Sequence, residues 1–257
     1  LQALLSGQAR HLTAWASGLS TPPPGCSYLN FTASHDGIGM RPLEGLVPEA
    51  ERSALVREVE ARGGQVSRKK NADGTESPYE LNITYFDALR DANPAIHLAR
   101  FLCSQTLPLC LQGVPTVYFQ SLVAAPNDES GVHRTGAPRS INRHKWQEQE
   151  LTSLLRQSDS PTARVLPEYL RRLRVRGGIP AFAPEVPQHI RDVHPGLFVV
   201  ERGAGPERIL AVHNLTAETI PLPGDLDHEP VRDLLNPEGQ ANAPLEPYAC
   251  RWLAARL

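Results

Sequence analysis

The stretch that decides the fold is Ser27-Tyr28-Leu29-Asn30-Phe31-Thr32-Ala33, followed directly by Ser34-His35-Asp36-Gly37-Ile38-Gly39. The first seven residues are prone to form a β-strand. The run then stops at polar residues and glycines, which is how a strand of a parallel sheet delivers side chains to a site at its carboxyl end. We therefore expect a buried strand over 27–33 with His35 and Asp36 at its end.

The segments around this strand alternate between helical and extended patterns. A second buried strand is expected over 114–119, where Pro115 favours the first residues of the strand. Between the two strands lies an inserted excursion, 40–93, with a helix over 48–62 and a hairpin or irregular segment over 65–84 that turns at 71–74. The other expected elements are a helix over 1–19, an apolar helix over 94–111, a long polar loop over 123–145, and helices over 147–175 interrupted at Pro161 and Pro167.

The end of the chain has a different pattern. Short β-prone runs separated by turn residues predict a small antiparallel sandwich-like module. These runs are 197–200, 209–214, 219–222, 231–234 and 249–253. The sequence therefore predicts an α/β chain with a first domain over 1–187 and an all-β domain over 188–257.

The composition excludes several classes of protein. The 257 residues carry a net charge of −2, so no basic field attracts nucleic acid or an anionic membrane surface. No apolar run is long enough to span a bilayer, and no signal peptide is recognisable. The four cysteines form no regular framework, which favours reduced, buried thiols and a cytoplasmic protein. The chain opens at Leu1 inside a helical pattern without an N-cap, so we expect an upstream part.

Three features carry polar chemistry. They are His35-Asp36, the strand from Gly113 to Phe119, and the loop from Asn127 to Arg143 with its carboxylates and arginines. Each also fits an ordinary structural role: a capped turn, a core strand and a solvated loop. Other chemistries lack their motifs, because the chain has no nucleophile elbow, no P-loop, no complete dinucleotide fingerprint and no zinc-like spacing of His and Cys. We therefore expect neither a cofactor nor a metal.

Taken together, these features resemble one branch of the α-amylase superfamily. The segment 33–42 resembles the histidine–aspartate motif after the seventh barrel strand, and the extension Asp36-Gly37-Ile38-Gly39 is similar to the branch of the sucrose, sucrose 6′-phosphate and glucosylglycerate phosphorylases. Segment 79–89 resembles the stretch before the next barrel helix, 113–119 the eighth strand, and 127–143 a mobile loop at the acceptor site. These matches run in family order over residues 1 to about 150.

The resemblance implies the C-terminal part of a (β/α)8 barrel followed by a small antiparallel β domain. It implies a retaining glucosyl transfer in which phosphate, as co-substrate, releases α-glucose 1-phosphate from an α-glucoside. Asp36 would be the carboxylate that stabilises the transition state, and His35 would bind a neighbouring hydroxyl. The further substrate-binding candidates are Asp128, Arg134, Arg143 and Tyr118.

The departure from the family is that the motifs of the first six strands, with the nucleophile and the acid/base, have no match in this sequence. We therefore expect the chain alone to be inert and to need the missing N-terminal half of its barrel. The donor sugar stays open, although 82–86 and 139–143 are slightly closer to the glucosylglycerate type. The alternatives are a fragment of a hydrolase or transglycosylase of the same superfamily, or a non-catalytic carbohydrate-binding module.

Overall fold

The computed structural model describes residues 1–226 and 231–255. The chain divides into two compact units, each built from separated segments. The first unit comprises Leu1–Phe31, Asp91–Thr116 and Glu168–Leu257, and the second comprises Thr32–Arg90 and Val117–Pro167. The predicted boundary at 187/188 falls where the final sheet begins, whereas the compact units divide the chain differently, so the two predicted domains stay a prediction.

The first unit contains a pair of short parallel strands, β1 (Leu29–Asn30) and β5 (Val114–Pro115). The backbone N–H of Val114 donates to the Tyr28 carbonyl at 2.9 Å, and that of Thr116 donates to the Asn30 carbonyl at 2.7 Å. Gly113 has φ +116°, and a Cβ there would lie 2.5 Å from the Tyr28 oxygen, so the close approach of the strands requires glycine.

The two strands differ from the sequence prediction in length and burial. Each has two residues rather than six or seven, because Pro115 offers no N–H and the chain soon turns into the helix α6 (Phe119–Leu122). They are also not buried: Leu29 is 61% exposed, Phe31 53% and Val114 43%. Apolar side chains this exposed, on strands without further neighbours, are typical of a sheet that lacks part of its cover.

The predicted helix over 1–19 is two helices, α1 (Gln2–Ser6) and α2 (Arg10–Ser17). Gly7 follows α1 with φ 68°, the left-handed conformation that ends helices. The predicted helix over 94–111 is confirmed as α5 (Pro94–Cys110). Asn93 caps it with its side-chain oxygen, which accepts the N–H of Ala95 at 3.0 Å. No helix in the described ranges is both long and apolar enough to cross a membrane.

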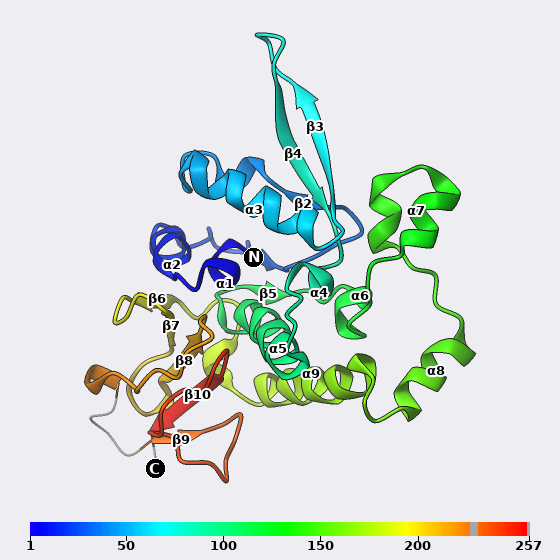
Figure 1. Ribbon diagram of the computed structural model, residues 1–257. Helices are drawn as coiled ribbons and strands as arrows, with labels where there is room; N and C mark the ends of the chain where they lie inside the picture. Colours follow the sequence, from blue (N-terminus) through cyan, green and yellow to red (C-terminus); the bar gives the residue numbers. More distant parts are fainter. Residues whose placement is uncertain (227–230, 256–257) are drawn as a thin grey trace. The chain divides into compact units, whose positions relative to one another are not determined.

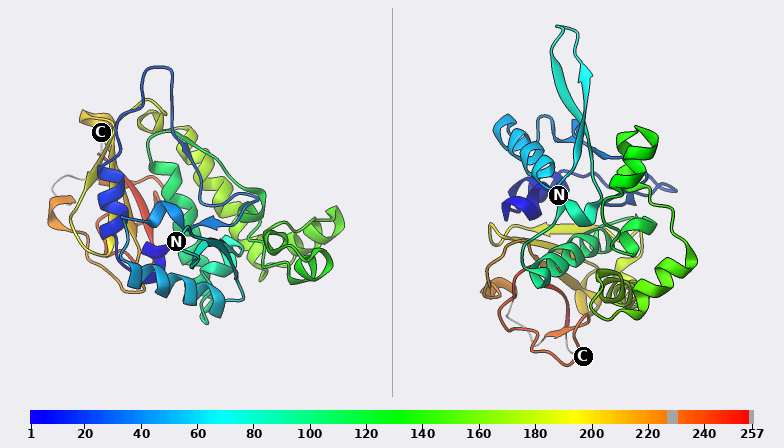
Figure 2. Two further views of the ribbon diagram at one scale, coloured as in Figure 1. Left: turned by 90° about the horizontal axis from the view of Figure 1, so that it is seen from above. Right: turned by 45° about the vertical axis from the view of Figure 1, so that its right-hand side comes forward.

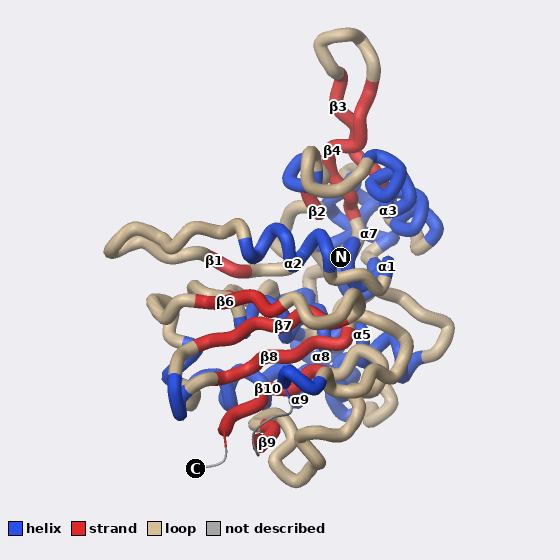
Figure 3. The backbone as a smooth tube through the Cα atoms, turned by 90° about the vertical axis from the view of Figure 1, so that its left-hand side faces the viewer, coloured by secondary structure: helices blue, strands red, loops and turns tan. Residues whose placement is uncertain are grey.

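The last part of the first unit is a five-stranded antiparallel sheet (Figure 3). Its strands follow the order β6-β7-β8-β10-β9. They are β6 (Gln188–Arg191), β7 (Leu197–Arg202), β8 (Ile209–Asn214), β9 (Val231–Asp233) and β10 (Cys250–Ala255). Strand β6 escaped the sequence prediction. The expected strand over 219–222 is only a bridge between Ile220 and Leu245, because Pro221 cannot donate a ladder hydrogen bond. In the described ranges these strands form one sheet rather than two.

Both faces of this sheet are covered. One face packs an aliphatic cluster that includes Leu197, Val212 and Leu253. On the other, Trp252 meets Phe182 edge to face with ring centroids 4.9 Å apart, and Cys110 of α5 lies 3.9 Å from the buried ring of His213. The cysteines are free, as expected, but Cys26 is exposed and Cys250 only partly buried, so burial was correct for Cys103 and Cys110 alone.

The second unit is built around a three-stranded antiparallel sheet (Figure 1). Of the two forms expected for 65–84, a hairpin or an irregular segment, the structure shows the hairpin. It consists of β3 (Gln65–Lys70) and β4 (Glu76–Asn82), turns through 71–74 and projects as a narrow ribbon (Figure 2). The short strand β2 (Ile38–Gly39), which the sequence did not predict, pairs with the other edge of β4. The predicted helix over 48–62 is α3 (Glu49–Ala61), and it packs beside the hairpin. The short helices η1 (Arg41–Leu43) and α4 (Tyr85–Ala88) complete the excursion.

The segment predicted as a long loop over 123–145 contains helices. It forms α7 (Glu129–Thr135) and η2 (Pro138–Asn142). The Asp128 side chain caps α7 by accepting the N–H of Gly131 at 2.7 Å, a local signal that the sequence prediction overlooked. The helix α8 (Glu148–Arg156) then ends before α9 (Pro161–Gly177), which starts at Pro161 as expected but continues through Pro167 without a break. The remaining short helices are η3 (Pro180–Phe182), η4 (Gly205–Glu207) and η5 (Gly224–Leu226).

Loss of the Asn93 cap should lower stability measurably. Asn93→Ala leaves the first N–H groups of α5 without their side-chain acceptor, so we expect the free energy of unfolding to fall by about 1 kcal/mol. Urea unfolding followed by circular dichroism measures this. Asn93→Asp, which keeps an oxygen at the cap, is the control and should stay near the wild type; equal losses in both variants would contradict the capping role.

The buried ring of His213 should make stability depend on pH. Burial lowers the pKa of His213 from 6.5 to about 4, because the charged imidazolium would lose its hydration. The neutral ring stabilises the fold fully above pH 6.5, and this contribution is lost as the pH falls from 6.5 towards 4, since the unfolded chain then binds a proton that the folded chain does not.

The loss over this range is of the order of 3 kcal/mol. Urea unfolding at a series of pH values, for the wild type and for His213→Asn, measures it as the difference between the two pH profiles. His189→Asn, at an exposed position on β6, is the matched control and should follow the wild type. Parallel profiles for wild type and His213→Asn would contradict the assignment.

Candidate functional site

Asp36 lies in the second unit, in the segment that follows β1 along the chain and precedes β2. Its carboxylate is half-exposed and is held by two guanidinium groups. Arg139 Nη1 lies 2.8 Å from Asp36 Oδ1, and Arg143 Nη2 lies 3.4 Å from the same oxygen. The ring of His35, which is well exposed, places Nε2 3.6 Å from Oδ1. All three contacts are made by Oδ1, so Oδ2 has no protein donor among the described residues.

A second carboxylate, Glu80 on β4, stands behind this group. It is 6% exposed and binds Arg139 through two hydrogen bonds, from Nε to Oε2 at 3.0 Å and from Nη2 to Oε1 at 2.9 Å. These hydrogen bonds with Glu80 raise the pKa of Arg139, and the charge of Asp36 adds to the effect. The N–H of Gly37 also donates to Glu80 Oε1 at 3.1 Å. A Cβ at Gly37 would lie 2.5 Å from Glu80 Cγ, so this approach requires glycine.

The backbone that carries His35 and Asp36 is clamped by η2 and the residue after it. Asn142 Nδ2 donates to the carbonyls of Ser34, at 2.7 Å, and of Asp36, at 3.3 Å. Arg143 Nε donates to the carbonyl of His35 at 2.7 Å. Carbonyls in a loop have no ladder partner, so these side chains satisfy them and hold the backbone around Asp36.

Tyr118 belongs to the same cluster through Asn142. Its hydroxyl donates to the carbonyl of Asn142 at 2.8 Å. Burial raises the pKa of Tyr118, and the nearby charge of Arg143 only partly offsets this, so the hydroxyl stays protonated and acts as a donor at neutral pH. Of the predicted site residues, the structure therefore brings together His35, Asp36, Arg143 and Tyr118.

Asp128 and Arg134 lie apart from this cluster and contact α7 and its surroundings. Besides capping α7, Asp128 places Oδ2 3.5 Å from His144 Nδ1 and 3.8 Å from Arg134 Nη2. Burial raises the pKa of Asp128, but hydrogen bonds from Ser130 and from the N–H of Gly131 outweigh it and hold the pKa below its ordinary value. The role that the structure gives Asp128 is thus a helix cap, and its predicted part in substrate binding stays a prediction.

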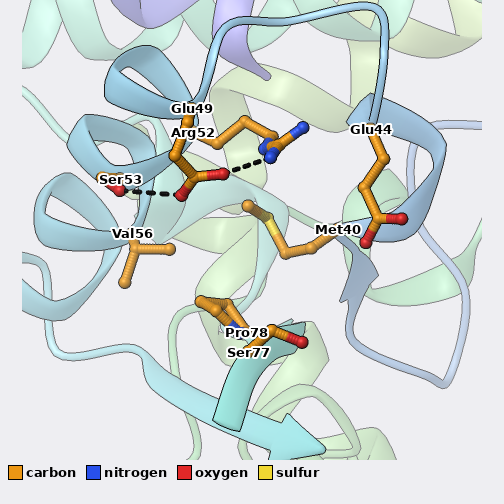
Figure 4. Close-up of a pocket in the computed structure, with 8 residues that line it drawn as sticks. All are labelled: Met40, Glu44, Glu49, Arg52, Ser53, Val56, Ser77 and Pro78. Carbon is orange, nitrogen blue, oxygen red and sulfur yellow. Dashed lines mark hydrogen bonds and ion pairs between the residues drawn. The ribbon is translucent and has the colours of Figure 1, made fainter. Parts of the chain in front are cut away.

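The described part of the second unit contains at least two hollows. The larger, of about 670 Å³, is lined by Asp128, Phe86, His144, Trp146 and Glu150 among others, with the indole N–H of Trp146 donating to Gln120 at 2.8 Å. The smaller lies between α3, the start of η1 and the hairpin, with Met40 in its wall and Arg52 paired to Glu49 (Figure 4). Its 70 Å³ holds about two water molecules at roughly 30 Å³ each, which is too little for a sugar.

Sequence reasoning did not assign a role to Glu80 or Asn142, and it included Arg139 only among the arginines of the loop from Asn127 to Arg143. Glu80 lies inside the segment 79–89 that carried the resemblance, which was the available signal. Its partners are 43 and 59 residues away in the chain, so spacing could not connect them. Among the described residues, no group of three or more His, Cys, Asp or Glu side chains is placed to hold a metal ion. The expectation that no cofactor is needed stays a prediction.

Asn142 should be needed to hold the Asp36 segment. Asn142→Leu removes the amide donor and leaves the carbonyls of Ser34 and Asp36 under-satisfied, so we expect a loss of about 1–3 kcal/mol in the free energy of unfolding. Chemical denaturation measures this. Ser140→Ala, in the same short helix but at a more exposed hydroxyl, is the control and should change stability by less than about 0.5 kcal/mol. A stability loss no larger than that of the control would show that Asn142 does not clamp the segment.

The fold can now be compared with solved structures. The chain superimposes on the crystal structure of a sucrose 6F-phosphate phosphorylase from Thermoanaerobacter thermosaccharolyticum with a TM-score of 0.68 and 22% sequence identity, covering 83% of this chain and 41% of that one. The predicted fold class is therefore confirmed: the chain has the architecture of the C-terminal part of a (β/α)8 barrel with a following antiparallel β region.

The sequence comparisons identify which enzymes the chain is similar to. The chain is 41% identical over 215 residues to a glucosylglycerate phosphorylase of Allomeiothermus silvanus, covering 82% of this chain and 38% of that protein. It is 39% identical over 187 residues to the glucosylglycerate phosphorylase of Escherichia coli (72% and 34%), and 29% identical over 191 residues to a sucrose 6(F)-phosphate phosphorylase of Ilumatobacter coccineus (71% and 34%). No protein-family model matches the chain.

These relatives confirm the resemblance drawn from the motifs. The chain is similar in sequence to glycoside phosphorylases of the α-amylase superfamily, with glucosylglycerate and sucrose 6-phosphate phosphorylases among its relatives. It spans little more than a third of the length of the curated relatives that it matches.

Proposed function

We propose that this chain supplies part of the active site of a retaining glycoside phosphorylase. The enzyme cleaves an α-glucoside with inorganic phosphate and releases α-glucose 1-phosphate, and glucosylglycerate is the donor that we favour. Two relatives at 41% and 39% identity, both named glucosylglycerate phosphorylases, support this choice of donor.

The observation that carries the proposal is the state of the Asp36 carboxylate. Glycosyl transfer passes through a transition state in which the sugar ring becomes positively charged, and a fixed carboxylate stabilises that charge. Asp36 is oriented through Oδ1 by two arginines, while Oδ2 has no protein donor in the described ranges and the side chain is 41% exposed. A carboxylate held by one oxygen presents the other to the hydroxyl groups and the ring of a bound glucosyl unit.

The remaining groups of the cluster have matching roles in this reaction. His35 reaches a hydroxyl next to the one that Asp36 binds, because its exposed ring lies beside the same carboxylate. Arg143 is a donor on the acceptor side, where the leaving group and then phosphate are bound. The Tyr118 hydroxyl donates its hydrogen to the carbonyl of Asn142, so its oxygen can accept a hydrogen bond there. Asp128 and Arg134 are proposed as contacts at the outer edge of the acceptor loop.

We place the nucleophile and the acid/base on polypeptide that this chain does not contain, so the chain alone is inert. The exposed Leu29, Phe31 and Val114 support this, because the parallel pair β1 and β5 leaves apolar side chains and open sheet edges for further strands to cover. The proposed partner is the rest of the barrel. We also propose that the protein is located in the cytoplasm, which its free thiols favour.

Complementation tests the function. This chain is mixed with the part of the Allomeiothermus silvanus glucosylglycerate phosphorylase that it does not match, and glucose 1-phosphate release from glucosylglycerate is assayed with and without phosphate. We expect release only in the mixture and only with phosphate, and a fall of at least about 100-fold for Asp36→Asn, since a lost transition-state contact costs about this much.

The other outcomes each exclude a part of the proposal. Glucose released without phosphate would identify a hydrolase, and release by the isolated chain would show that it carries a complete site. Full activity of Asp36→Asn would remove Asp36 from the reaction. Glu76→Gln, at an exposed position on β4, is the matched control for a change of one carboxylate and should keep full activity.

A further inference from the structure

We infer that Glu80 is a positioning residue that aims the Arg139 guanidinium at Asp36. The geometry of the three side chains carries this inference by itself, and its meaning for catalysis rests on the proposed function. The hairpin excursion that carries Glu80 thereby becomes part of the active site, although its strands were expected only as an insertion.

The guanidinium of Arg139 is used on two sides. Its Nε and Nη2 donate to the two oxygens of Glu80, at 3.0 and 2.9 Å, while Nη1 lies 2.8 Å from Asp36 Oδ1. A guanidinium is rigid and planar, so fixing the edge formed by Nε and Nη2 also fixes the direction in which Nη1 donates. Without Glu80, the long side chain of Arg139 could adopt other rotamers, because it lies at a partly exposed position.

Glu80 is the anchor of this chain of contacts because its own position is held most firmly. It lies on the central strand of the sheet, with Gly39 of β2 on one side and Ser67 of β3 on the other. Its side chain is only 8% exposed, whereas those of Arg139 and Asp36 are 40% and 41% exposed. The N–H of Gly37 adds a further hydrogen bond, which ties Glu80 to the residue next to Asp36.

Glu80 also settles the charge of the group. Asp36 and Glu80 contribute two negative charges, and Arg139 and Arg143 contribute two positive charges. The four side chains together therefore carry no net charge, because Glu80 balances Arg139 and Asp36 balances Arg143. Loss of Glu80 would leave the group with an excess positive charge beside a sugar ring that is itself becoming positive, which opposes the transition state.

Nitrogen-15 NMR of the arginine side chains tests the inference on the complete chain. The Nε–H signal of Arg139 is assigned by its loss in Arg139→Lys, and its exchange with water is measured at neutral pH. In Glu80→Gln, which keeps the shape and one acceptor oxygen, we expect exchange about tenfold faster, the factor expected when a charge-assisted hydrogen bond is lost. In Asp36→Asn we expect exchange within about twofold of the wild type, since the bonds to Glu80 remain.

The comparison of Glu80→Gln with Asp36→Asn shows which carboxylate holds Arg139 in place. Unchanged exchange in Glu80→Gln would overturn the inference, and so would equal acceleration in Asp36→Asn, which would make Asp36 the anchor instead. Glu76→Gln on the same strand is the matched control and should leave the signal unchanged. If Glu80→Gln does not fold, the comparison of Asp36→Asn with the wild type still decides, because Asp36 is half-exposed and its neutralisation leaves the bonds between Glu80 and Arg139 in place.

The measurement needs no turnover, so it is separate from the complementation assay. A protected Arg139 in a chain that never yields glucose 1-phosphate would leave the positioning role standing and remove the proposed function. If the complemented enzyme is active but the exchange rate of the Arg139 Nε–H is the same in Glu80→Gln as in the wild type, the proposed function stands and the positioning role is removed.

Discussion

The organisation of the site depends on one buried carboxylate. Glu80 lies on the middle strand of a small sheet, and a buried carboxylate is stable only when its oxygens are paired. Arg139 and the N–H of Gly37 provide that pairing. The requirement to satisfy Glu80 therefore brings η2 against the segment that follows β1, and with it the second guanidinium, of Arg143, and the amide of Asn142. Asp36 is oriented as a consequence of this packing rather than by its own loop.

The same arrangement explains why the polar segment 123–145, predicted as a loop, forms helices. The stretch 123–145 is rich in polar residues and glycine, yet most of its side chains are engaged. Asp128 caps α7, Asn142 and Arg143 satisfy backbone carbonyls of 34–36, and the N–H of Asp128 donates to the carbonyl of Ile141 at 2.8 Å. Each of these hydrogen bonds satisfies a backbone N–H or carbonyl that would otherwise be unpaired. These bonds hold the segment as two short helices. The site thus joins residues 34–36 to 142–143, about a hundred residues away along the chain, and Glu80 of β4 binds both Gly37 and Arg139.

The first unit shows the opposite situation around β1 and β5. There the backbone pairing is correct, with glycine allowing the close approach at residue 113, but large apolar side chains face outward. The central strands β7, β8 and β10 of the five-stranded sheet in the same unit are covered by aliphatic side chains on one face and by α5 and its neighbours on the other. Leu29, Phe31 and Val114 thus leave exposed apolar surface beside the parallel strands, and this is where the proposed partner would pack.

The sequence by itself determined the elements whose signals are local. The capped helix α5, the helix α3 with its leading proline and closing glycines, the hairpin β3–β4 and most strands of the final sheet follow from periodicity, capping and turn residues that act within a few positions. The motif around His35 and Asp36 also indicated the family, which the relatives confirm.

Only the tertiary structure decided the features that depend on distant partners. The pairing of β2 with β4, the short and exposed form of β1 and β5, and the position of the end of η2 against residues 34–36 each depend on which distant groups lie nearby. The role of Glu80 is the clearest case. From the sequence, a glutamate on a strand is expected to face solvent, and only the fold places the guanidinium of Arg139, 59 residues away, against it. Hydrogen bonding and burial act through space, and no spacing along the chain records them.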